Sequence, residues 1–174
     1  MSSQNLSITQ AGAVARITLT QPEIRNAFSD EVIAEITAAF VDVGSRADVR
    51  AVVLAAEGPA FCAGANLNWM RRMADYTRDE NIADAGKLAE MLRVIYECPK
   101  PTIARVQGDV YAGGMGLVAA CDMAVAVDTP SYMRKMPNFV SSMGALRVAA
   151  RPSASTRRVS AGSITPSSHR RAVA

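Results

Sequence analysis

Apolar and polar residues alternate along the first part of the chain with the two periods that distinguish strands from helices. Residues 13–20 alternate and are rich in β-branched side chains, which predicts a strand. The apolar residues of 32–43 recur every three or four positions and predict a helix. Ser29 is placed to cap the start of this helix, and Gly44 is placed to end it.

The same succession of strands and helices continues beyond residue 44. The run 49–56 is almost continuously apolar, as is typical of a strand buried on both faces. The elements predicted after it are a short helix from Asn68, a polar and mobile surface connection at 76–81, a helix at 82–96, a strand at 102–106, a helix after Gly113 and a strand at 123–127. Because strands alternate with helices, the sequence predicts an α/β fold with mostly parallel connections.

The composition is that of one globular domain followed by a segment of different character. The 174 residues are 49% hydrophobic, which is enough for one core of substantial size. Residues 1–128 contain all sixteen acidic residues, whereas 129–174 contain eight Lys and Arg, no acidic residue and nine of the fourteen serines. We therefore expect a folded core over 1–128 and a basic, Ser/Arg-rich, poorly ordered tail over 129–174. No recognised nucleic-acid-binding motif accompanies these basic residues, so nucleic acid is not the expected partner.

The sequence also bears on compartment and on metal chemistry. The first residues are polar and do not have the pattern of a secretory signal, and no run of about 18 apolar residues offers a membrane span. We therefore expect a soluble, cytoplasmic protein that does not act at a membrane. Cys62, Cys98 and Cys121 are widely separated and His169 is the single histidine, which argues against a disulfide framework and against a metal site.

Two loops of small residues follow predicted strands and precede predicted helices. The first is Ala63-Gly64-Ala65 and the second is Gly113-Gly114. Ligands of α/β sheets bind beyond the carboxyl ends of the strands, so both loops are expected at one edge of the sheet. Backbone N–H groups from the two loops could then meet at one oxygen, as in an oxyanion hole, because glycine and alanine leave the backbone accessible.

Four motifs, in order and spacing, make the chain resemble the crotonase family of enoyl-CoA hydratases and isomerases. They cover about residues 10–132 and are Arg25-Asn26-Ala27, residues 60–67, Lys100–Ala104 and Gly113–Asp122. The last of these is similar to the corresponding run of methylglutaconyl-CoA and carboxygeranoyl-CoA hydratases. The resemblance implies a spiral of ββα units, an acyl-CoA substrate, no cofactor besides the coenzyme A of that substrate, and a homotrimer or hexamer.

The resemblance also implies roles for individual residues. The N–H groups of Ala65 and Gly113 would hold the thioester oxygen and stabilise an enolate. Arg25 would lie near the phosphates of coenzyme A or be a solvated turn residue, and Trp69 and Met70 would line the acyl pocket or pack in the core. Further substrate contacts are expected from Ala27, Ala63, Asn66, Leu67 and Gly114.

The chain departs from the family pattern at the carboxylates that hydration uses. Hydratases of the family commonly have two glutamates as general base and acid, and Gly116 stands where the first is expected. The second is expected in a Glu-x-x-x-Gly-Leu-x-Pro context, but the chain has no glutamate after Glu97 and no acid after Asp128. Residues 131–138 stand in its place, and the chain therefore looks like a truncated, frame-shifted or otherwise atypical member.

Two functions follow from this combination of a familiar loop pair and missing carboxylates. The first is hydration of a 2-enoyl-CoA to a 3-hydroxyacyl-CoA, with the enolate stabilised by a backbone oxyanion hole. The alternative is a catalytically impaired or non-catalytic acyl-CoA-binding fragment. The sequence leaves open the acyl chain and the choice between hydratase and isomerase.

Overall fold

A computed structural model describes residues 5–127 of the protein. Its main sheet has five strands in the order β1-β2-β3-β5-β7, and a second sheet consists of β4 and β6. The strands are β1 (Leu6–Ala11), β2 (Val14–Leu19), β3 (Ala51–Ala56), β4 (Ala60–Cys62), β5 (Thr102–Val106), β6 (Asp109–Val110) and β7 (Met123–Ala126). The helices are α1 (Asp30–Ser45), α2 (Leu67–Met73), α3 (Arg78–Tyr96) and α4 (Gly114–Ala120), with a single 3₁₀ turn at Pro22–Ile24.

The elements repeat as two strands followed by helix. The units are β1-β2-α1, β3-β4-α2-α3 and β5-β6-α4, after which β7 joins the main sheet beside β5. Only β1 pairs with its neighbour in the antiparallel sense, while β2 with β3, β3 with β5, β5 with β7 and β4 with β6 are parallel. The predicted α/β class, parallel connections and ββα repetition are therefore confirmed.

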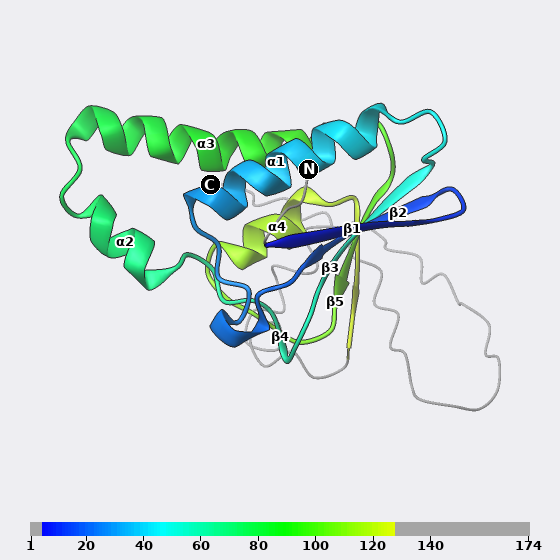
Figure 1. The fold of residues 1–174 in the computed structure, drawn as a ribbon, viewed down its shortest axis with the longest axis horizontal. Helices are drawn as coiled ribbons and strands as arrows, with labels where there is room; N and C mark the ends of the chain where they lie inside the picture. The colour runs from blue at the N-terminus through cyan, green and yellow to red at the C-terminus, as the bar shows by residue number, and fades with distance from the viewer. Residues whose placement is uncertain (1–4, 128–174) are drawn as a thin grey trace, which may run out of the picture.

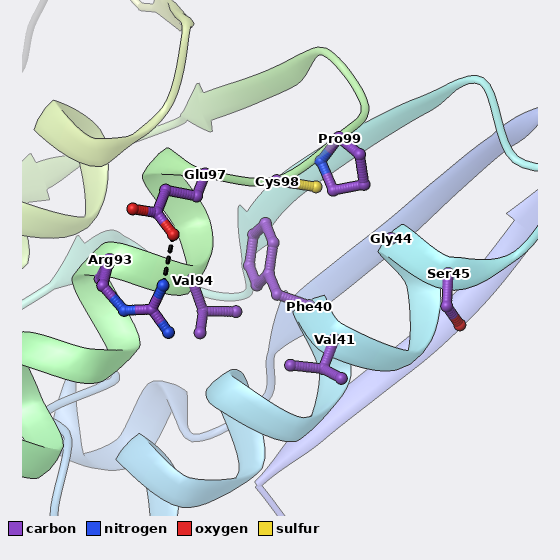
Figure 2. Close-up of a pocket in the computed structure, with 9 residues that line it drawn as sticks. All are labelled: Phe40, Val41, Gly44, Ser45, Arg93, Val94, Glu97, Cys98 and Pro99. Atoms are coloured by element: carbon purple, nitrogen blue, oxygen red, sulfur yellow. Dashed lines mark hydrogen bonds and ion pairs between the residues drawn. The ribbon is translucent and has the colours of Figure 1, made fainter.

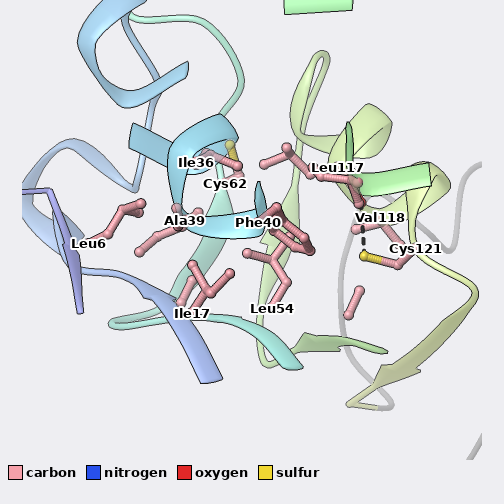
Figure 3. Packing of buried hydrophobic residues seen from close by; sticks show 14 of the residues in the cluster. Leu6, Ile17, Ile36, Ala39, Phe40, Leu54, Cys62, Leu117, Val118 and Cys121 are labelled. Carbon is pink, nitrogen blue, oxygen red and sulfur yellow. Dashed lines mark hydrogen bonds between the residues drawn. The ribbon is translucent and has the colours of Figure 1, made fainter. Parts of the chain in front are cut away.

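The helices pack on one another above the sheet. Figure 1 shows α3 and α1 side by side with α4 beneath them, and both α1 and α4 contact α3. The interior is apolar: Ile36 and Phe40 of α1 lie over Ile17 and Leu54 of the sheet, with Leu117 of α4 alongside (Figure 3). Within the described part of the chain, no helix is both long and apolar enough to cross a membrane.

Two local predictions about helix ends are wrong. Residues 76–81 are not a mobile connection throughout, because α3 begins at Arg78 behind a capping box in which Thr77 and Glu80 hydrogen-bond each other's backbone N–H groups. Gly44 does not end α1, which continues to Ser45. A Cβ at Gly44 would lie 3.3 Å from Cδ of Pro99, so this glycine permits the close approach of the chain after α3.

Candidate functional site

The two small-residue loops follow the two strands of the second sheet. Residues 63–66 come directly after β4 and residues 111–113 directly after β6, and these strands are parallel neighbours. The chain therefore leaves both strands in the same direction, toward α2 and α4. The two loops therefore lie at one edge of a sheet, as expected. That sheet is the small one formed by β4 and β6, which the sequence did not predict, and not the main sheet.

The structure brings the two loops into direct contact. A Cβ added to Gly64 would lie 3.0 Å from Cβ of Ala112 and 3.3 Å from the backbone nitrogen of Gly113. On the other side, a Cβ at Gly114 would lie 2.8 Å from the carbonyl oxygen of Cys62. Side chains at either glycine would push the loops apart, which is the physical reason for the small residues.

A third segment, residues 25–28, runs alongside the first loop. The N–H of Ala63 donates to the carbonyl of Arg25, that of Phe28 donates to Gly64, and that of Asn66 donates to Phe28, each at 2.9 Å. The ring of Phe28 also reaches the second loop, because its Cζ is 2.6 Å from where a Cβ of Gly113 would stand. Phe28 thus holds both loops, one through its backbone and the other through its ring.

Asn26 fixes the position of this third segment. Its side chain is buried, donates to the carbonyl oxygens of Glu57 at 2.8 Å and Ala60 at 2.9 Å, and accepts from the N–H of Gln21 at 3.0 Å. Arg25 and Asn26 both have a φ of 53°, in the left-handed region that asparagine tolerates better than most residues. Sequence reasoning gave neither Asn26 nor Phe28 a role, although an asparagine next to a turn is the signal that points to such backbone bonding.

Two backbone donors remain unpaired where the loops meet. Among residues 5–127, no backbone or side-chain acceptor takes a hydrogen bond from the N–H of Ala65 or of Gly113. On one side of each donor the next N–H is engaged, since Gly64 donates to Sγ of Cys62 at 3.4 Å and Gly114 donates to the carbonyl of Tyr111 at 2.8 Å, whereas Ala112 has no acceptor among the described residues. Both residues are half-buried, so these two N–H groups are open to water or to a ligand.

The backbone next to the Gly113 donor is strained at one residue. Ala112 has a φ of 44°, in a region that costs an L-residue about 1 to 2 kcal/mol. Gly64, in the facing loop, has a φ of 88°, which a glycine adopts without that cost. Strained backbone is concentrated at functional sites, where the surrounding structure holds it in place.

The other residues predicted for the site differ in exposure. Ala27 and Gly114 are buried, Ala63 and Asn66 are half-buried, and the side chains of Arg25 and Leu67 are exposed. The Asn66 side chain is already engaged, because its Oδ1 accepts from the N–H of Asn68 at 2.9 Å and of Trp69 at 3.3 Å as the cap of α2. It is therefore the backbone of this residue, rather than its amide group, that remains for other contacts.

Few side chains near the two loops could transfer a proton, act as a nucleophile or bind a metal ion. Gly116 lies on the side of α4 that faces α3, and a Cβ there would be 3.4 Å from a methyl carbon of Leu92. Burial raises the pKa of the Cys62 thiol to about 11, so it is neutral and a poor nucleophile at neutral pH. Within residues 5–127, no three His, Cys, Asp or Glu side chains gather closely enough to hold a metal ion.

A separate cavity of about 280 Å³ lies between the C-terminal ends of α1 and α3. Figure 2 shows Phe40 and Val94 at its wall, with the Arg93–Glu97 ion pair at its rim and Cys98 and Pro99 at its end. It is lined by Phe40, Val41, Gly44, Ser45, Arg93, Val94, Glu97, Cys98 and Pro99, and so by none of the residues predicted for the site. Its walls offer packing surface but no set of converging polar groups.

The repeated ββα units define the fold class, an α/β spiral whose small-residue loops meet beside the second sheet. The sequence profile of the enoyl-CoA hydratase/isomerase family matches residues 9–152, and the chain belongs to that family. A Thermus thermophilus protein provisionally named an enoyl-CoA hydratase is 40% identical over 116 residues, which are 67% of this chain and 46% of that protein.

Solved structures agree with this assignment. A crystal structure of an enoyl-CoA hydratase from Shewanella pealeana has a TM-score of 0.72 and 33% identity, with 80% of this chain and 55% of that one covered. The enoyl-CoA hydratase of Mycobacterium smegmatis has a TM-score of 0.69 and 37% identity, with 74% and 49% covered. The chain thus spans about half the length of the relatives that it matches.

Proposed function

We propose that the protein binds an acyl-CoA thioester and that the carbonyl oxygen of the thioester accepts hydrogen bonds from the N–H groups of Ala65 and Gly113. One observation carries this proposal: these two donors lie in contacting loops and have no acceptor among residues 5–127. Membership of the enoyl-CoA hydratase/isomerase family supplies the ligand class. Two fixed donors aimed at one oxygen favour the state in which that oxygen carries negative charge, which here is the enolate.

The surrounding residues are proposed to hold the rest of the ligand. Arg25 is exposed beside the first loop, and its guanidinium would bind the phosphates of coenzyme A. Ala63, Leu67 and the backbone of Asn66 would contact the adenine and pantetheine. The buried Ala27 and Gly114 would keep the approach to the donors free of side chains.

The chemistry proposed first is the addition of water to a 2-enoyl-CoA. In other enzymes, removing one backbone or side-chain donor of an oxyanion hole costs about 3 to 4 kcal/mol of transition-state stabilisation, and we expect each of the two loop donors to contribute a similar amount. Proton transfer needs a further acid or base, and the position on α4 where the family commonly has a glutamate is Gly116. General acid–base catalysis contributes about 10² to 10⁴ in rate, so we expect hydration to be slower by this factor than with the usual glutamates.

A second candidate is an acyl-CoA binder without catalytic turnover. The observation in its favour is the same Gly116, which provides no proton-transferring group and packs toward Leu92. Both candidates require the oxyanion site, and they differ only in whether the bound thioester reacts. With either function, we expect the protein to assemble as a homotrimer or hexamer, as the family does.

A pair of ligands that differ by one oxygen tests the site without any mutation. Butyryl-CoA has the thioester carbonyl, and S-butyl-CoA is the thioether that lacks it. Calorimetry on the 174-residue chain should give about tenfold or greater weakening for S-butyl-CoA, since two hydrogen bonds are lost. Equal affinities would contradict the oxyanion assignment, and robust hydration of crotonyl-CoA followed by absorbance would reject the non-catalytic candidate.

A further inference from the structure

The direction of the free N–H of Ala65 is set by one pairing of the backbone. Phe28 and Ala65 form an isolated parallel β-bridge, in which the N–H of Phe28 donates to the carbonyl of Gly64 and the N–H of Asn66 donates to the carbonyl of Phe28, each at 2.9 Å. In a parallel pair, the residue between two neighbours bonded in this way turns its own N–H and carbonyl away from the partner strand. The bridge therefore leaves the N–H of Ala65 free and fixes where it points.

The chain reaches this bridge through a bend that is unfavourable in itself. Arg25 and Asn26 are consecutive residues with a φ of 53°, a region that L-residues adopt at a cost and that asparagine tolerates better than most. The bend is closed by two backbone bonds, from the N–H of Arg25 to Pro22 at 3.0 Å and from the N–H of Asn26 to Gln21 at 2.8 Å. Backbone in such a conformation persists when contacts from the rest of the fold hold it.

The side chain of Asn26 supplies contacts of this kind. It is only 3% exposed, and its amide nitrogen donates to the carbonyl of Ala60, the first residue of β4. The loop that contains Ala65 follows β4 directly. The same two segments are thus joined twice, once between Asn26 and Ala60 and once between Phe28 and Ala65. Because the first junction fixes how the segments lie against each other, it also fixes the register of the second.

We infer that Asn26 is a positioning residue for thioester binding, whose buried amide holds Phe28 in the register that leaves the N–H of Ala65 free and fixed in direction. The inference rests on the proposed binding of an acyl-CoA thioester. Asn26 needs no contact with the ligand, because its side-chain hydrogen bonds all go to the backbone of residues 21, 57 and 60. Loss of the amide should therefore reduce the part of the affinity that comes from the thioester carbonyl and leave the rest.

The variant Asn26→Gly provides the first test, because glycine adopts the left-handed conformation readily and removes only the amide. Calorimetry with butyryl-CoA and S-butyl-CoA isolates the carbonyl, since both ligands contain the same coenzyme A. We expect the preference for butyryl-CoA to fall from about tenfold in the native chain to about twofold or less, with the affinity for S-butyl-CoA unchanged. A preference that stays near its native value would overturn the inference, as would loss of S-butyl-CoA binding by a folded variant.

A destabilised variant without a role in the junction serves as the control. Thr77→Ala removes the cap of α3, which lies outside all three segments of the junction, and it should keep the native preference for butyryl-CoA. If Thr77→Ala loses that preference as well, a general loss of stability explains the result and the inference is rejected.

Hydrogen exchange in the native chain provides the second test, which does not depend on the folding of Asn26→Gly. Coupling between two sites is reciprocal, so a thioester held by Ala65 must strengthen the hydrogen bonds of Asn26 as much as these bonds strengthen its binding. With each ligand at the same large multiple of its own Kd, butyryl-CoA should slow the exchange of the Asn26 side-chain amide protons, measured by NMR, several-fold more than S-butyl-CoA. Equal slowing would overturn the inference. A failure of the proposed function would look different, since butyryl-CoA would then bind the native chain no better than S-butyl-CoA.

Discussion

At the scale of single residues, the two loops can meet only because three glycines have no side chain where a neighbouring residue approaches closely. Gly113 has no side chain to collide with Phe28, Gly64 has none to collide with Ala112, and Gly114 has none to collide with Cys62. In each case the neighbour is in the core or in the facing loop. The geometry of the two free donors is therefore sensitive to the smallest possible substitution.

Gly113→Ala should weaken the binding of butyryl-CoA by about tenfold or more. The new methyl group would stand 2.6 Å from Cζ of Phe28, so either the ring or the loop must move and the Gly113 N–H loses its place. Calorimetry with butyryl-CoA measures the effect. Gly86→Ala on α3 is the matched control, because a Cβ there has nothing within 4 Å, and it should retain binding while stabilising the helix by up to about 1 kcal/mol. Unchanged affinity in Gly113→Ala would contradict this reading of the junction.

At the scale of elements, the strongly periodic segments were predictable from the sequence. The apolar alternation of 13–20 and the helical stripe of 32–43 correspond to β2 and to α1. The strand β1 was not predicted, because Leu6 and Ile8 alone are too few alternating apolar residues to indicate a strand, and only Leu6 is buried. Strands β4 and β6 were missed because three and two residues are too few to show a period.

Part of the candidate site could likewise be predicted from local sequence, whereas another part depends on residues that are distant in the chain. The two loops of small residues were visible in the sequence because glycine and alanine mark positions where a backbone must be approached. The roles of Asn26 and Phe28 were not visible, since each acts on partners more than thirty residues away. An asparagine next to a turn indicates bonding to the backbone, but no local pattern says which distant groups Asn26 or Phe28 will meet, and only the docking of the ββα units reveals them.

The start of α3 allows a prediction at this scale. Thr77→Ala should lower the free energy of unfolding by about 1 kcal/mol, because Oγ1 of Thr77 accepts from the N–H of Glu80 and the substitution leaves that donor without its cap. Thr77→Ser keeps the acceptor and should lose much less. Urea unfolding followed by circular dichroism measures both. Losses of equal size would show that the hydroxyl does not contribute and that α3 is held by packing alone.

At the scale of the whole molecule, the buried thiols couple the fold to pH. Burial raises the pKa of Cys62 from 9.0 to about 11 and that of Cys121 to about 12, whereas the unfolded chain exposes both. Above pH 9 the unfolded state therefore releases protons that the folded state retains. The free energy of unfolding should fall as pH rises from 9 to about 11, by about 1 kcal/mol per thiol per pH unit.

Urea unfolding at pH 8 and pH 10 checks this expectation. The native chain should lose stability between the two values, and a variant with Cys62→Ala and Cys121→Ala should lose less, since other groups still titrate in both proteins. Below pH 9 the thiols are neutral in both states and should give no pH dependence. Parallel losses in the two proteins would assign the effect to those other groups.

The origin of the loop junction in three distant segments has a consequence for how the protein folds. Residues 25–28, 63–66 and 111–113 come from three successive ββα units, and no two of them are neighbours in the chain. Closing such long loops is slow compared with forming a helix, so the junction is among the last features that a folding chain acquires. A partly folded chain therefore lacks the loop junction. A ligand bound there would stabilise only the fully docked arrangement, and each unit would share in that stabilisation although no single unit contains the site.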